Sequence, residues 1–133
     1  MNELSVESAD KAKEFERILK QLVALYTEFS VMSGKKPTEI INLFKFRILN
    51  EYISLANNFL GDGSKPIQFF KLFEETDLPN ASDIVVVLRM YLEALYDWWR
   101  ARSESTGYGA ANWIVKGKSS NVRCEIPKRP WKD

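Results

Sequence analysis

The chain has 133 residues, of which 45% are hydrophobic and 28% are charged, and its formal net charge is +1. This length and composition predict one globular domain, and the near-neutral charge does not by itself indicate a nucleic-acid or membrane partner. The sequence has no histidine and one cysteine, Cys124, which excludes nucleophiles that depend on histidine, metal or haem sites held by histidine, and an internal disulfide.

The first five residues, Met1 to Ser5, contain neither a basic stretch nor an apolar run, so no signal peptide is expected. The longest apolar stretch, 84–99, is interrupted by Arg89, Glu93 and Asp97, so no membrane span is expected either. Together with the single cysteine, these features predict a cytoplasmic protein.

Apolar residues at a spacing of three to four predict a first long helix that ends near Ser33 and Gly34. Ser5 or Ser8 is the expected N-cap, and Gly34 suits the left-handed residue that follows a helix. The expected inner face consists of Phe15, Ile18, Leu22, Leu25, Tyr26 and Phe29.

A second helix is expected from a cap at Thr38 to a stop at 61–63, where the sequence reads Gly-Asp-Gly. Its apolar stripe is broad, which predicts contact on two sides, as in a central bundle helix or a helix that forms a dimer. The stripe comprises Ile41, Phe44, Ile48, Tyr52, Leu55 and Phe59, and is widened by Ile40, Leu43, Leu49, Ile53 and Ala56.

A short third helix is expected after Ser64, with Ile67, Phe70 and Phe73 facing inward and an end at 78–79. The fourth helix is expected from Asn80 or Ser82 to about Arg102, because Asn80 and Asp83 resemble a capping box. Its inner stripe comprises Ile84, Leu88, Tyr91, Leu92, Leu95 and Trp99.

The pattern changes after Ser103. Residues 105–109 are typical of a loop, and 113–116 and 122–126 of two short strands around a polar turn at 117–121. An isolated hairpin is marginally stable, so this one must lie against the helices or another chain. The sequence therefore predicts a mainly α fold, a bundle of about four helices over 1–104, with a C-terminal extended segment or small β-hairpin over 105–133 packed on the same domain.

The C-terminal segment is basic. Residues 113–133 carry six basic and two acidic side chains, a net charge of +4, and the rest of the chain carries a net charge of −3. Basic groups beside tryptophans could hold a phosphate backbone while the rings stack on bases. The alternative is a tail that docks on the acidic helical body. The partner-binding candidates here are Lys116, Lys118, Arg123, Lys128, Arg129 and Trp131, and Lys132 is the sixth basic residue.

Trp98 and Trp99 are adjacent, so on a helix their side chains point about 100° apart and cannot enter the same core layer. Trp99 continues the inner stripe, and Trp98 falls near its edge. Trp98 is therefore a further partner-binding candidate, since tryptophan is enriched at binding hot spots. The alternative is that the C-terminal hairpin covers it.

Paired carboxylates are the one remaining route to catalysis. Glu93 and Asp97 lie one helical turn apart, but Arg89 and Arg100 are close enough to neutralise them. A magnesium site needs several oxygen ligands, and the second helix offers no matching acidic pair. We therefore predict no catalytic residue, no cofactor and no metal.

These features predict a non-enzymatic protein–protein interaction module that forms a homo-oligomer, most simply a homodimer, or belongs to a larger complex. The alternative is a small nucleic-acid-binding subunit that uses the basic C-terminal segment.

Overall fold

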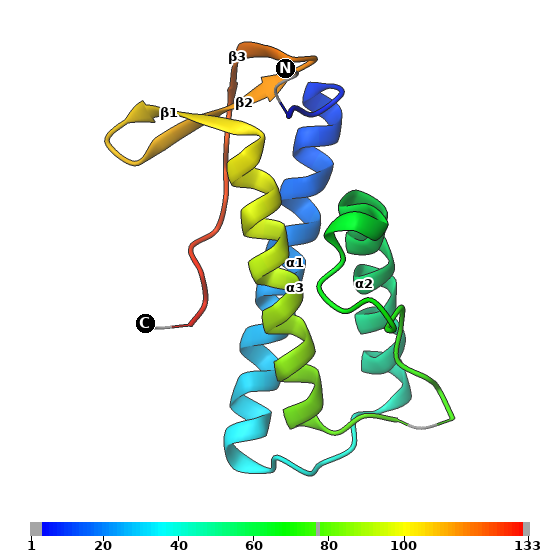
Figure 1. Ribbon diagram of the computed structural model, residues 1–133. Coiled ribbons are helices and arrows are strands. Elements are labelled where there is room, and N and C mark those ends of the chain that lie inside the picture. Colours follow the sequence, from blue (N-terminus) through cyan, green and yellow to red (C-terminus); the bar gives the residue numbers. More distant parts are fainter. Residues whose placement is uncertain (1–3, 77, 132–133) are drawn as a thin grey trace.

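The computed structural model describes residues 4–76 and 78–131, which form three helices and a three-stranded antiparallel sheet (Figure 1). The helices are α1 (Ala9–Lys35), α2 (Leu43–Ser64) and α3 (Ala81–Ala101), and the strands are β1 (Ser103–Gly107), β2 (Ala110–Val115) and β3 (Lys118–Arg123). The prediction of a mainly α fold is confirmed. The prediction of about four helices is wrong, because the fold mixes three helices with a sheet.

The cap of α1 is Ser8, whose hydroxyl accepts a hydrogen bond from the Lys11 backbone N–H at 3.1 Å. Ser5, the other candidate, instead accepts one from the Gly117 N–H at 3.0 Å. The helix continues through Gly34 to Lys35. Gly34 is therefore an ordinary helical residue, and its predicted left-handed conformation is wrong.

The start of α2 was predicted four residues too early, since its cap is Asn42 rather than Thr38. The phase of its inner face also differs from the predicted stripe, because Phe44 is 74% exposed. The side chains that are buried are Phe46, Leu49, Ile53, Ala56 and Leu60. Gly61 interrupts the helix with φ 69°, a conformation that glycine adopts without strain, and one more turn follows to Ser64.

The predicted third helix is absent from the described part of 65–80, which forms a long connection between α2 and α3. Two asparagines of α2 hold this connection. The Asn50 amide donates to the Phe73 carbonyl at 2.9 Å and accepts from the Phe73 N–H at 3.1 Å. Asn57 donates to the Lys71 carbonyl at 3.0 Å and accepts from the Tyr91 hydroxyl at 2.6 Å. Backbone groups that a helix would pair internally therefore bond to α2 instead.

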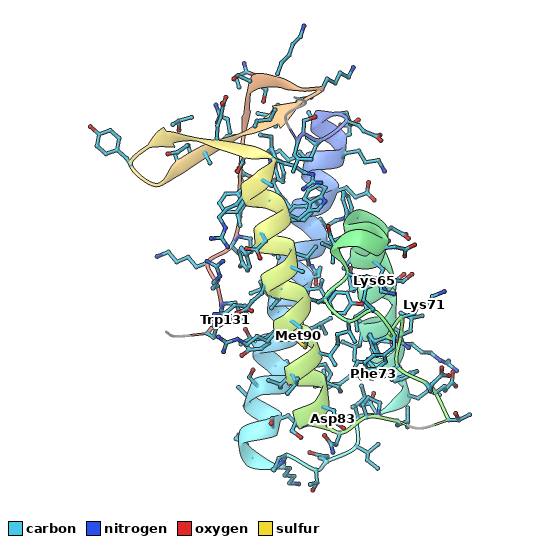
Figure 2. The ribbon with its side chains drawn as sticks, in the orientation of Figure 1. Lys65, Lys71, Phe73, Asp83, Met90 and Trp131 are labelled. Carbon is cyan, nitrogen blue, oxygen red and sulfur yellow. The ribbon has the colours of Figure 1, made fainter. Side chains whose placement is uncertain are left out.

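The connection still buries apolar surface as expected. Ile67, Phe70 and Phe73 are half-buried, and the Phe70 ring packs edge-on against Phe73 and Tyr91. Figure 2 shows Phe73 beside α2. Apolar content thus predicted correctly that this segment packs, but not that it packs without helical backbone.

In α3 the sequence prediction holds closely. Asn80 is the cap, and its side chain accepts from the Asp83 N–H at 2.9 Å. The helix ends at Ala101, one residue before the expected end. The predicted inner stripe is buried as far as Leu95, and Trp99 is half-buried.

The predicted C-terminal hairpin is part of a three-stranded sheet in the order β1-β2-β3. Its second strand was placed too late, because β3 covers most of the predicted turn at 117–121. The extra strand is β1, most of which was predicted as a loop. Both connections are two residues long, Tyr108–Gly109 and Lys116–Gly117, and all four residues have positive φ, as type I′ turns require. The short turns were not predicted because Tyr108 and Lys116 occupy positions where Asn, Asp or Gly is usual.

The sheet and the helices share one core. Trp113 of β2 is completely buried, and its ring contacts Phe15 of α1 edge-on at 5.5 Å. The N-terminal segment adds to the sheet, since Val6 exchanges backbone hydrogen bonds with Ile114 and Lys116 at 2.9 Å each. No helix in residues 4–76 and 78–131 is long and apolar enough to cross a membrane.

We expect Asn50→Ala to lower the free energy of unfolding by about 1–3 kcal/mol, because it leaves the N–H and C=O of Phe73 without partners. Asn58→Ala is the matched control on the exposed side of the same helix, and its expected effect is within about 0.5 kcal/mol. Urea denaturation measures both. Equal effects of the two substitutions would show that Asn50 does not hold the connection.

Candidate functional site

A buried carboxylate joins α1 to the C-terminal segment. Glu16 is 5% exposed, and its Oε2 accepts hydrogen bonds from the Trp113 indole at 2.9 Å and from the Glu125 N–H at 2.8 Å. Its Oε1 lies 3.1 Å from the Lys13 ammonium. A buried charge is tolerated only when it is paired and hydrogen-bonded, as this one is. Glu16 therefore fixes both β2 and the start of the tail on α1.

Trp98 lies at the junction of all three helices and the sheet. Its ring stacks on Phe15 at 4.7 Å and meets Phe59 edge-on at 5.5 Å. Trp113 of β2 is 6.2 Å away, and the Arg102 guanidinium lies over the Trp98 ring at 4.1 Å. Trp98 is half-buried, so the chain's own side chains cover much of it.

Two shallow clefts flank the pair formed by Trp98 and Arg102. One, of about 380 Å³, lies where the N-terminal segment meets the three helices and includes Leu55 and Asn58. The other, of about 470 Å³, includes Ala94 and also reaches Trp98 and Arg102. Burial lowers the pKa of Arg102, and its side chain donates to the Trp98 carbonyl at 3.1 Å. The two clefts therefore share one tryptophan and one arginine side chain.

The tail after β3, residues 124–131, runs along α1 and α3 (Figure 1). The Tyr96 hydroxyl donates to the Pro127 carbonyl at 2.7 Å. The Trp131 ring meets Tyr26 edge-on at 5.5 Å and Tyr96 at 6.5 Å, and Figure 2 shows Trp131 against these helices. The tail therefore lies against Tyr26 of α1 and Tyr96 of α3, and we call the surface beneath it the groove.

Two guanidinium groups complete the contact between tail and groove. The Arg89 guanidinium of α3 lies 4.4 Å from the centre of the Trp131 ring, and the Arg129 guanidinium of the tail lies 4.7 Å from that of Tyr96. Such cation–π contacts each contribute about 0.5–2 kcal/mol. Two of the predicted partner-binding residues, Arg129 and Trp131, are thus engaged within the chain.

The other basic candidates are exposed and form no ion pair among the residues described; they are Lys116, Lys118, Arg123 and Lys128. Lys116 and Lys118 lie at the β2–β3 turn, at one end of the molecule, and the end of the tail lies well down the helices (Figure 1). The basic side chains are therefore divided between two places. Lys132 lies outside the described residues.

The surroundings of the Cys124 thiol oppose its ionisation. Burial raises the pKa of the Cys124 thiol, and the Glu16 carboxylate raises it further, while Trp99 and Lys13 oppose the shift. A raised pKa makes a thiol a poor nucleophile at neutral pH. Among the described residues, no three Asp, Glu or Cys side chains gather as metal ligands.

The candidate acidic pair of α3 is occupied by arginines of the same helix. Glu93 lies 3.6 Å from Arg89, and Asp97 lies 2.6 Å from Arg100. All four side chains are exposed, so each pair contributes at most about 1 kcal/mol to stability. Each carboxylate of this pair is thus neutralised on the surface by an arginine of its own helix.

Sequence reasoning missed Glu16 and the groove. A signal for Glu16 existed, because Ala12 and Leu19 lie at the i−4 and i+3 positions, which places Glu16 on an apolar face. Nothing comparable pointed to the groove. Tyr26 and Tyr96 are far apart in the sequence, and each is indistinguishable from an ordinary core residue.

Comparisons with known proteins add no relative from which a site could be transferred. No protein-family model, no curated protein and no solved structure matches the chain. The functional assignment therefore depends on the chain's own contacts and exposed surfaces.

We expect Glu16→Ala to lower the free energy of unfolding by about 3 kcal/mol, because the buried Trp113 indole and the partly buried Glu125 N–H lose their acceptor. Glu14→Ala is the control on the same helix. Glu14 makes only an exposed pair with Lys11, worth about 0.5 kcal/mol. Urea denaturation followed by tryptophan fluorescence measures both. A small effect at Glu16 would mean that the sheet and tail are held without it.

Burial raises the pKa of Tyr96 to about 12, and Arg129 opposes the shift. Tyrosine in the unfolded chain titrates near 10. The contribution of neutral Tyr96 to stability is therefore complete below pH 10 and is lost as the pH rises from 10 to 12. We expect Tyr96→Phe to be less stable than the wild type at pH 8 but to lose less stability between pH 10 and 12. Denaturant titrations across this range test this, and parallel losses would contradict it.

Proposed function

We propose that this protein is a non-enzymatic interaction module that binds a protein surface, most simply a second copy of itself. One observation carries the proposal. Three apolar side chains at and just before the start of α2 are exposed to solvent, Ile40 by 62%, Leu43 by 41% and Phe44 by 74%. We call them the α2 patch.

The exposure of the α2 patch is not a consequence of poor packing. In the same helix Leu49, Ile53 and Ala56 are completely buried. Covering a large apolar side chain contributes roughly 1.5–3 kcal/mol. A partner that covers the patch would therefore gain several kcal/mol, before the cost of association.

A second copy is the simplest partner because an apolar patch is complementary to itself. A two-fold interface places the same surface on both subunits, so a charged patch would repel its copy and an apolar one does not. Two nearby charges are already neutralised within the chain, since Lys45 lies 2.6 Å from Glu28 and Arg47 lies 3.3 Å from Glu75. These pairs leave the apolar side chains as the main feature of this end of α2.

We expect the protein to form a dimer at micromolar concentration, and Phe44→Ser to weaken the dimer by at least about tenfold, or 1.4 kcal/mol. Tyr108→Ser is the matched control, because Tyr108 is a fully exposed aromatic residue on the β1–β2 turn. Sedimentation equilibrium measures all three proteins. A wild-type protein that remains at 15.4 kDa up to roughly 1 mM, about 4 kcal/mol of association energy, would refute self-association.

The alternative proposal is a small nucleic-acid-binding subunit. Lys116 and Lys118 support it, since both are exposed beside one turn. Base stacking by Trp131 would require the ring to leave Arg89 and Tyr26. Fluorescence anisotropy with short DNA and RNA separates the two proposals, because phosphate binding weakens steeply as salt rises.

A further inference from the structure

The contact between the tail and the helices differs from ordinary core packing. Within residues 126–131 the one hydrogen bond to another element comes from the Tyr96 hydroxyl to the Pro127 carbonyl. Pro127 and Pro130 have no backbone N–H to satisfy. The segment can therefore leave the groove without breaking backbone-to-backbone hydrogen bonds like those between the β-strands.

The contact is also reciprocal. The groove supplies a cation, Arg89, to an aromatic ring of the tail, and the tail supplies a cation, Arg129, to an aromatic ring of the groove. A purely apolar surface would bind any apolar peptide segment. Paired cation–π contacts instead require a basic residue and an aromatic residue at a fixed spacing, which gives specificity.

Both tyrosines of the groove contact the tail. With the tail in place Tyr26 is 8% exposed and Tyr96 is 3% exposed, and both rings contact Trp131. Removing the tail would take the Trp131 ring away from both tyrosines. The tail sequence that covers them reads Pro-Lys-Arg-Pro-Trp over 127–131. Aromatic-lined grooves that bind proline-containing extended segments are a recurring mode of peptide recognition.

We infer that the groove between α1 and α3, lined by Tyr26, Arg89 and Tyr96, is a recognition site for a partner's extended Pro-x-x-Pro segment that carries a basic residue and ends in tryptophan. Residues 126–131 occupy the groove as an internal ligand. A tethered ligand competes at an effective concentration in the millimolar range, so the partner binds only when it displaces the tail. This site is separate from the α2 patch and does not depend on self-association.

The test uses the full-length protein and a fluorescein-labelled peptide with the sequence of residues 126–133, titrated in an anisotropy assay. Trp131→Ala weakens the internal ligand and leaves the groove intact. We expect this variant to bind the peptide at least about tenfold tighter than the wild type. Arg129→Ala removes the other cation–π contact of the tail. This variant is tested for peptide binding as well, in case Trp131→Ala melts at a much lower temperature.

Two controls establish that the groove is the site. Adding Arg89→Ala to the Trp131→Ala receptor should weaken peptide binding several-fold, because Arg89 contacts the tryptophan of the bound segment. A peptide whose tryptophan is replaced by alanine should bind correspondingly less. The inference is overturned if neither variant binds the peptide with a dissociation constant below about 1 mM, or if neither binds it more tightly than the wild type. It is also overturned if neither Arg89→Ala nor the alanine-containing peptide weakens binding.

Discussion

The hydrogen bonds of the Glu16 carboxylate are the interaction that joins the helices to the sheet. The carboxylate is buried on α1, where an unpaired charge would be strongly unfavourable. Lys13 of the same helix pairs with one carboxylate oxygen, and the other accepts its hydrogen bonds from the C-terminal part of the chain. The Trp113 indole and the Glu125 N–H must both be in place for this to occur. One side chain near the N-terminus therefore determines where β2 lies and where the tail begins its course along the helices.

Aromatic side chains surround this junction, and their contacts stabilise it. Phe15 contacts Trp98 and Trp113, so one residue of α1 touches both α3 and the sheet. The tail then continues along the same two helices through contacts between rings and guanidinium groups. The two ends of the molecule differ in consequence. At the end with the sheet the chain's own aromatic side chains pack together, whereas the α2 patch at the other end is exposed to solvent.

The elements that were predicted well are those whose pattern is local. Asn80 followed by Asp83 sets the start of α3 because the cap bonds to a backbone group three residues away. The periodicity of α1 and α3 identifies their buried faces for the same reason. The phase of α2 was misplaced because a broad apolar stripe does not say which of its sides meets the neighbouring helices. Only that packing leaves Phe44 in solvent and buries Phe46.

By itself the sequence determined that the protein is mainly helical, that it lacks histidine chemistry, and that its tryptophans and basic residues gather near the C-terminus. The tertiary structure decided the rest. Where a helix was predicted, an irregular connection lies against α2, and the amides of Asn50 and Asn57 bond to its backbone. It also decided that Arg129 and Trp131 contact their own chain. Contacts between residues tens of positions apart have no periodic signature, so only the folded chain shows them.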